Sequence, residues 1–182
     1  MFVRHKSWRI NSHNNLLTLG VRKLCAHLIG GDMLNDWQII LRLILSVILG
    51  GFVGLERQMQ RRNAGLRTHI LVCMGSCLIM LTSLYVFDIY NDIVALDPTR
   101  IAAGVITGIG FLGAGAIIRA QEGVKGLTTA ASLWVVAAIG LAIGCGFYSA
   151  AMTATLLALI ALFVLRRVES KVFQREGGRD GI

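Results

Sequence analysis

The segment with the clearest chemical potential is residues 54–58 (GLERQ), where a long apolar run ends abruptly in charge. The run itself, residues 37–55, is about long enough to cross a bilayer, and Arg42 is its only charge. Glu56 and Arg57 therefore stand where hydrocarbon gives way to headgroups, and desolvating charge is costly there. Because a carboxylate has a short stem for reaching water and gains nothing from anionic lipid, Glu56 is the strongest candidate for a functional group.

Other polar residues flank the ends of the predicted helices and extend this candidate site. The predicted intramembrane polar network consists of Glu56, Arg57, Arg67, Asp97, Arg100, Arg119 and Thr128. In such a network carboxylate and guanidinium groups compensate each other's charge. For the arginines the alternative is ordinary snorkelling to the membrane interface, and the sequence leaves both interpretations open.

Five apolar runs must position these residues, and each is about long enough to span a bilayer as a helix. The runs are residues 37–55, 69–87, 101–118, 127–144 and 149–165. No stretch alternates apolar and polar residues over the length of a barrel strand. The sequence therefore predicts an all-α polytopic bundle of about five transmembrane helices, forming one membrane domain over residues 37–166.

Composition supports a membrane protein. Hydrophobic residues make up 55% of the chain and charged residues 15%, against about a quarter in soluble domains. The net charge of +8 comes mostly from the ends and one loop, so it bears on membrane orientation before nucleic acid, and no nucleic-acid partner is predicted. No nucleophile, base and orienting group occur together, so we predict no enzyme, catalytic residue or cofactor.

The distribution of Lys and Arg predicts the orientation in the membrane. The first and third loops and the basic tail, 167–182, carry the positive charge and are predicted to be cytoplasmic. Five spans then place the N-terminus outside. The N-terminal extension, 1–36, conflicts with this because it is basic; it is either a short amphipathic segment or a mis-assigned start, and a start near Met33 is preferred.

Glycine pairs four residues apart mark candidate packing faces. Gly50 and Gly54 lie on one face of the first predicted helix, and Gly104 and Gly108 on one face of the third. Small residues at this spacing let helix backbones approach closely in lipid. Tight packing within the bundle is the preferred interpretation, and self-association through one such face is the alternative.

Three other patterns are not taken as ligand sites. Residues 108–113 (GIGFLG) match a dinucleotide fingerprint only formally, because they lie in a predicted spanning helix without the strand that the motif requires. Cys73 and Cys77 lie in an apolar run without further ligands, so we expect packing and no metal site. His69 is expected to be structural. The acidic second loop is expected to be solvated, although its carboxylates can attract hydrated divalent cations.

Several motifs in order resemble the MgtC/SapB family of bacterial inner-membrane proteins. They are residues 54–58 (GLERQ), 64–69 (AGLRTH), 97–103 (DPTRIAA), 108–115 (GIGFLGAG) and 126–134 (GLTTAASLW). The resemblance implies a multi-pass protein of the inner membrane, linked to survival in low magnesium and to acid tolerance. It also implies that Glu56 corresponds to the family's acidic residue. The sequence ends soon after Arg179, so we expect a short member without the soluble C-terminal domain of some relatives.

The resemblance and the residues lead to two hypotheses. The first is a non-enzymatic regulator that contacts other inner-membrane proteins through Gly50 and Gly54, with Glu56, Arg57 and Arg67 as its polar core. The resemblance suggests the F-type ATP synthase or a magnesium transporter as the partner, besides membrane lipid and a second copy of the chain. The alternative is a small oligomeric transporter or conduit for Mg²⁺ or H⁺ that uses Glu56.

Overall fold

The computed structural model describes residues 35–90, 97–120, 123–165 and 167. Its helices are α2 (Asp36–Met59), α3 (Leu66–Tyr90), α4 (Thr99–Ala116), α5 (Leu127–Gly144) and α6 (Tyr148–Ile160), and a π-helical turn (Ala161–Leu165) continues α6. The predicted all-α bundle is confirmed. Nearly all of the N-terminal extension and of the basic tail, and Asp92 of the second loop, lie outside the described residues.

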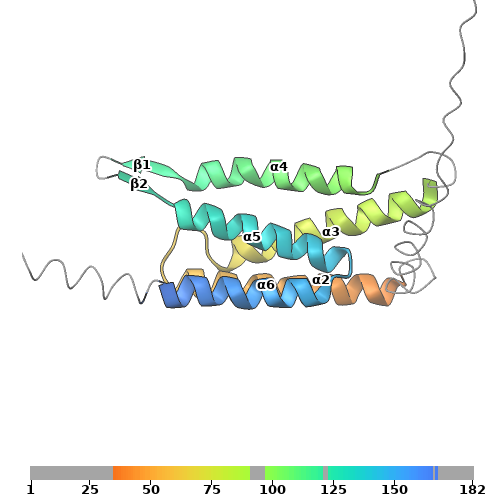
Figure 1. The fold of residues 1–182 in the computed structure, drawn as a ribbon, viewed down its shortest axis with the longest axis horizontal. Helices are drawn as coiled ribbons and strands as arrows, with labels where there is room; N and C mark the ends of the chain where they lie inside the picture. Colours follow the sequence, from red (N-terminus) through yellow and green to blue (C-terminus); the bar gives the residue numbers. More distant parts are fainter. Residues whose placement is uncertain (1–34, 91–96, 121–122, 166, 168–182) are drawn as a thin grey trace, which may run out of the picture. The chain divides into compact units, whose positions relative to one another are not determined.

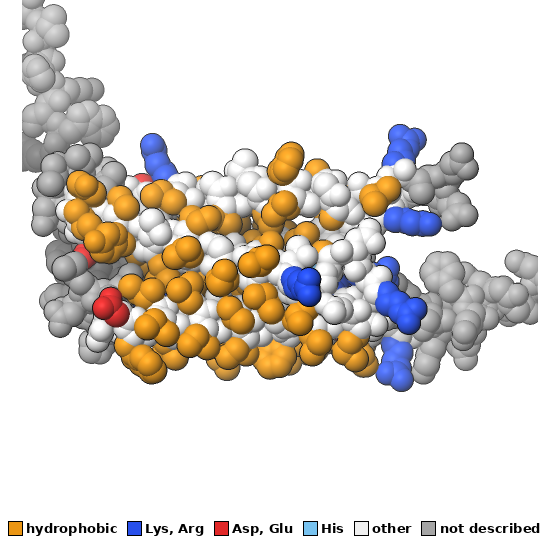
Figure 2. All heavy atoms as spheres, turned by 180° about the vertical axis from the view of Figure 1, so that it is seen from behind, with side chains coloured by type: hydrophobic (Ala, Val, Ile, Leu, Met, Phe, Trp, Pro, Cys, Tyr) orange, Lys and Arg blue, Asp and Glu red, His pale blue; other side chains and the backbone are white. Residues whose placement is uncertain are grey.

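In the part of the chain that the structure describes, four helices, α2 to α5, are long and apolar enough to cross a membrane, and α6 with its π-helical turn forms a shorter apolar segment. Their exposed surface is rich in large apolar side chains, as expected of a surface that meets lipid. Figure 2 shows this apolar face, with most of its Lys and Arg side chains gathered at one end. Helix length, apolar surface and the position of charge thus agree on a membrane-spanning bundle.

Helix α5 is the centre of the bundle and packs against α2, α3, α4 and α6 (Figure 1). Half of the residues in the apolar stretch of α5 are buried, whereas α4, on the outside, is the least buried of the four long helices. The core between α2, α3 and α5 contains Val53, Cys73, Cys77 and Val136, each with no exposed surface. Both cysteines therefore serve as small packing residues at this place.

Close approach of the helices depends on glycine at specific positions. A Cβ atom added to Gly50 would lie 2.6 Å from Cys73 Cβ, and one added to Gly54 would lie 2.8 Å from Leu66 Cα. Both contacts are far below van der Waals distance, so α2 can lie against α3 only with glycine there. Gly140 and Gly144 of α5 approach the backbone of α3 in the same way.

Gly104 and Gly108 occupy a different environment from Gly50 and Gly54. An added Cβ at either position would meet no described atom within 4 Å, so these glycines do not mediate packing inside the described bundle. They line an apolar groove of about 450 Å³ between α3 and α4. The groove exists because Gly75, Gly104 and Gly108 have no side chains to fill it.

A short hairpin that the sequence analysis did not predict joins α4 to α5. Strand β1 (Ile118–Ala120) pairs antiparallel with β2 (Gly123–Lys125), with Arg119 opposite Val124. Gly126 ends the hairpin in a left-handed conformation, with φ of 97°, and lies against the carbonyl group of Ala116. Only glycine fits both constraints, and this fixes where α5 begins.

Candidate functional site

The end of the bundle beside the hairpin contains a buried ion pair in the last turns of α2. Arg57 Nε donates to Glu56 Oε2 at 2.5 Å, and the two side chains are 2% and 10% exposed. The other carboxylate oxygen, Glu56 Oε1, is buried and accepts no hydrogen bond from the described residues. Arg57 therefore compensates one oxygen of the Glu56 carboxylate, and no described residue donates a hydrogen bond to the other.

His69 of α3 lies next to this ion pair and has no exposed surface. Its Nδ1 lies 2.8 Å from the carbonyl oxygen of Gly65 and its Nε2 lies 3.0 Å from Ser132 Oγ on α5. His69 also interacts electrostatically with both Arg57 and Glu56. Residues from α2, α3 and α5 thus meet in one buried polar cluster, defined here as Glu56, Arg57, His69 and Ser132.

Local features of the sequence build this cluster. Gln58, one residue after the ion pair, accepts a hydrogen bond from the backbone N–H of Leu66 at 3.1 Å and so caps the start of α3. Gly54 lets His69 approach α2, since an added Cβ would lie 2.9 Å from His69 Cβ. The motif GLERQ therefore has a structural explanation: glycine brings α3 close, glutamate and arginine pair, and glutamine caps the next helix.

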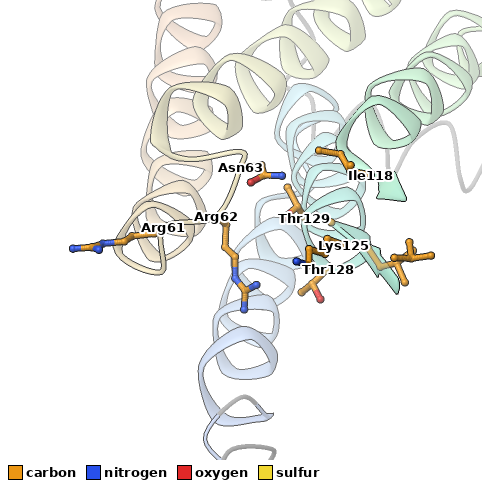
Figure 3. A pocket seen from close by; sticks show the side chains of 10 residues that line it. Arg61, Arg62, Asn63, Ile118, Lys125, Thr128 and Thr129 are labelled. Atoms are coloured by element: carbon orange, nitrogen blue, oxygen red, sulfur yellow. The ribbon is translucent and has the colours of Figure 1, made fainter. Parts of the chain in front are cut away.

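An open pocket of about 480 Å³ lies at the same end of the bundle (Figure 3). The polar residues that line it are Arg61, Arg62, Asn63, Lys125, Thr128 and Thr129. In Figure 3 the Arg61 side chain points away from α5, whereas Asn63 faces the start of that helix. Thr129 connects the pocket to the cluster, because its carbonyl oxygen accepts a hydrogen bond from Ser132 Oγ at 2.8 Å.

The structure places the seven residues of the predicted network in three groups. Only Glu56 and Arg57 are buried together. At the hairpin end, Arg67, Arg119 and Thr128 have exposed side chains, and only Thr128 lines the pocket. Exposure of the two arginines agrees with snorkelling. The prediction that all seven residues form a single buried network remains a hypothesis.

Asp97 and Arg100 form the third group, at the opposite end of α4 from Arg119. Both are exposed. Asp97 Oδ1 accepts hydrogen bonds from the backbone N–H of Thr99 at 2.9 Å and from its hydroxyl at 2.6 Å. These bonds, together with nearby Arg100, lower the pKa of Asp97. At this position Asp97 caps the start of α4, away from the hairpin end where Glu56 lies.

Arg42 is a second buried polar residue whose partners the sequence did not reveal. It is 3% exposed, lies in α2 and bonds to the far end of α5 and the start of α6. His69 was expected to be structural, and its contact with Ser132 was not anticipated. The sequence contained the same clue to both residues, because a polar side chain inside an apolar run needs a hydrogen-bond partner. The sequence of the run does not identify that partner.

The described residues include no three His, Cys, Asp or Glu side chains grouped so that they could hold a metal ion. The absence of a metal site in the whole protein thus remains a prediction. Chemically, the cluster offers a carboxylate with one oxygen that no described residue binds and an imidazole with two hydrogen-bonded nitrogens. Such groups can bind a proton or interact with a cation at membrane depth.

A family model described as the MgtC family matches residues 43–171. The chain is 46% identical over 140 residues to YhiD of Escherichia coli (strain K12), covering 76% of this chain and 65% of the relative. It is 42% identical over 135 residues to Protein MgtC of Salmonella typhimurium (strain LT2), covering 74% and 55%.

A third relative is Protein SapB of Bacillus subtilis (strain 168), 38% identical over 148 residues, covering 77% of this chain and 63% of the relative. The chain thus matches less than two thirds of the length of each of these relatives. No solved structure shows significant similarity.

Proposed function

This chain belongs to the MgtC family of bacterial membrane proteins, and from that premise we propose that it is a non-enzymatic regulator of other inner-membrane proteins. The family resemblance and the name of the YhiD relative, which refers to magnesium transport, support a role in adaptation to low magnesium or to acid stress. The proposed partner is an integral inner-membrane protein, with the F-type ATP synthase and a magnesium transporter as the candidates. We propose the orientation with the hairpin end in the cytoplasm and the N-terminus outside.

The apolar groove between α3 and α4 carries this proposal. A groove of about 450 Å³ lined by glycines is suited to a transmembrane helix, because small residues permit close backbone approach in lipid. The sequence suggested Gly50 and Gly54 as the surface for a partner. Both are occupied by α3 of the same chain, so the proposed contact surface moves to Gly104 and Gly108.

Site-specific photo-cross-linking in the cell membrane tests the regulator. A photoreactive residue at Leu112, a half-exposed side chain in the groove, is expected to form an adduct recognised by antibodies to one of the two candidate partners. Gly108→Leu fills the groove and is expected to reduce the adduct by about tenfold, equivalent to about 1.4 kcal/mol of contact.

Gly110→Leu is the matched control, because Gly110 lies on the same helix, is open to added atoms and does not line the groove. An adduct that survives Gly108→Leu as well as Gly110→Leu would contradict the groove as the contact surface. An adduct only with a second, differently tagged copy of the chain would replace the proposed partner by a homo-oligomer.

A second candidate function is a small oligomeric transporter or conduit for Mg²⁺ or H⁺. It is favoured by the buried Oε1 atom of Glu56, which has no hydrogen-bond partner among the described residues. Ion flux into liposomes that contain the purified protein tests this function. Glu56→Gln is expected to abolish flux, while Asp36→Asn, which changes an exposed acid at the start of α2, leaves it unchanged. Absence of flux from correctly inserted wild-type protein would reject transport and leave the regulator.

A further inference from the structure

The three hydrogen bonds of the His69 and Ser132 side chains cannot all form at once when the imidazole is neutral. The two side chains then carry only two protons for these three contacts. A carbonyl oxygen only accepts, so His69 Nδ1 must donate its N–H to Gly65 O. In a neutral imidazole Nε2 then carries no proton and must accept from the Ser132 hydroxyl. Yet Ser132 Oγ also lies 2.8 Å from Thr129 O, which can only accept, and a hydroxyl has one proton.

Two arrangements resolve this competition without moving any heavy atom. With neutral His69, the Ser132 hydroxyl donates to Nε2 at 3.0 Å. With protonated His69, Nε2 donates to Ser132 Oγ, and the hydroxyl turns to Thr129 O. Both ring nitrogens of the imidazolium are then satisfied by Gly65 O and Ser132 Oγ, even though the ring is fully buried.

Charges of both signs lie near the ring. From α2, the carboxylate of Glu56 favours a positive charge on His69 and the guanidinium of Arg57 opposes it. Helix α5 contributes the uncharged Ser132 and Thr129 and contains no titratable residue. The only charged residue of α4 is Arg100, near the other end of that helix, and Arg67 of α3 is exposed. Glu56 Oε1, without a partner among the described residues, leaves negative charge available to an incoming proton.

We infer that His69 is a proton-binding site in which Ser132 reverses its hydroxyl when the proton binds, with Glu56 as the counter-charge. The ligand is a proton, and its route is the basic pocket, since Thr129 both lines that pocket and accepts the Ser132 hydrogen bond. This inference goes beyond the proposed function. It depends neither on partner binding nor on ion flux.

The test is ¹⁵N NMR of the full chain in lipid nanodiscs with ¹⁵N-labelled histidine rings. The chain contains four histidines, and His69→Asn identifies the signals of this one. In the wild type, the His69 ring is expected to change from a neutral ring protonated at Nδ1 to the imidazolium as the pH is lowered to about 5.

Ser132→Ala removes the acceptor of the Nε2 proton, and a hydrogen bond to the charged ring is about twice as strong as one to the neutral ring. The titration midpoint is therefore expected to fall by about one pH unit, which is a tenfold loss of proton affinity. Glu56→Gln is expected to lower the midpoint as well. Ser83→Ala is the matched control, because Ser83 is a buried serine of α3 whose hydroxyl binds Pro98 O, and it should not shift the midpoint.

A His69 ring that stays neutral down to pH 5 in the wild type would overturn the inference, and this measurement needs no variant. An equal midpoint in Ser132→Ala and Ser83→Ala would also overturn it. If Ser132→Ala does not fold, Ser132→Thr, which keeps the hydroxyl, is expected to titrate like the wild type, and a shifted midpoint in that variant would contradict the role of the hydroxyl.

Discussion

Arg42 of α2 donates from Nη1 to the carbonyl oxygen of Gly144, the last residue of α5, at 2.8 Å. Its Nε also donates to the hydroxyl of Tyr148 at 3.0 Å, and the guanidinium lies 6.0 Å from the centre of that ring. A cation at a helix C-terminus interacts favourably with the unpaired carbonyl groups and with the helix dipole. One buried arginine thereby joins α2, α5 and α6.

Arg42→Met is expected to lower the free energy of unfolding by about 2–3 kcal/mol, because it removes charged hydrogen bonds and leaves the Gly144 carbonyl without this partner. Reversible unfolding in mixed micelles, followed by circular dichroism, measures this. Arg67→Met serves as the control because Arg67 is exposed, and its stability is expected to change by less than about 0.5 kcal/mol. If both substitutions changed the free energy of unfolding equally, the hydrogen bonds of Arg42 would not stabilise the bundle.

Gly140→Ala and Gly104→Ala are expected to have different effects on stability. A Cβ at Gly140 would lie 2.8 Å from Ser76 Cβ and even closer to the Cys73 carbonyl oxygen, so α3 and α5 must separate. We expect a loss of about 1–3 kcal/mol from this overpacking. Gly104→Ala meets open space and is expected to be neutral or to stabilise by up to about 1 kcal/mol. The same unfolding assay compares them, and a neutral Gly140→Ala would contradict the close packing of α3 and α5.

Asp97→Ala is expected to expose the first turn of α4. The variant loses both hydrogen bonds from Thr99, so amide hydrogen exchange at Thr99 and Arg100 is expected to accelerate several-fold, with α5 unaffected. Because the pKa of Asp97 is lowered, its stabilising effect is fully present above the ordinary aspartate pKa of about 3.9 and is lost as the pH falls through the lowered value. Unchanged exchange in the variant at neutral pH would show that the cap is dispensable.

Cysteine labelling tests the proposed orientation. In a Cys25→Ser background, a membrane-impermeant maleimide added to intact spheroplasts is expected to label Cys145, which is partly exposed in the loop after α5. Cys73 and Cys77 are fully buried and are expected to remain unlabelled. Labelling should disappear in Cys145→Ser. Labelling of Cys145 only in inverted vesicles would show that the protein has the opposite orientation.

The sequence predicted the helices well because the thickness of the bilayer sets the length that an apolar run needs in order to span it. The run 127–144 coincides with α5, and α2 extends its predicted run, 37–55, by one residue before and four after. The hairpin was missed because strands of three residues are too short to show alternation. Its defining residues, Gly123 and Gly126 at positive φ, read equally well as a loop.

The site was predictable only where its members are neighbours in sequence. Glu56 and Arg57 are adjacent, and their charge at the end of an apolar run was enough to identify them. His69 and Ser132 are 63 residues apart, and neither has a local pattern that names the other. Gly54 and Gly108 have the same spacing motif, yet one is buried and the other open. Spacing defines a face of a helix, whereas the partner depends on the arrangement of the whole bundle.

The distance along the chain between Arg42 and its acceptors has a consequence for synthesis. Gly144 follows Arg42 by 102 residues and Tyr148 by 106. At about 5–20 residues per second, α2 is made roughly 5–20 s before either acceptor leaves the ribosome. During that interval Arg42 has neither of these two acceptors, and an unpaired guanidinium is costly in hydrocarbon. The contact that joins α2, α5 and α6 can therefore form only after α6 has been made.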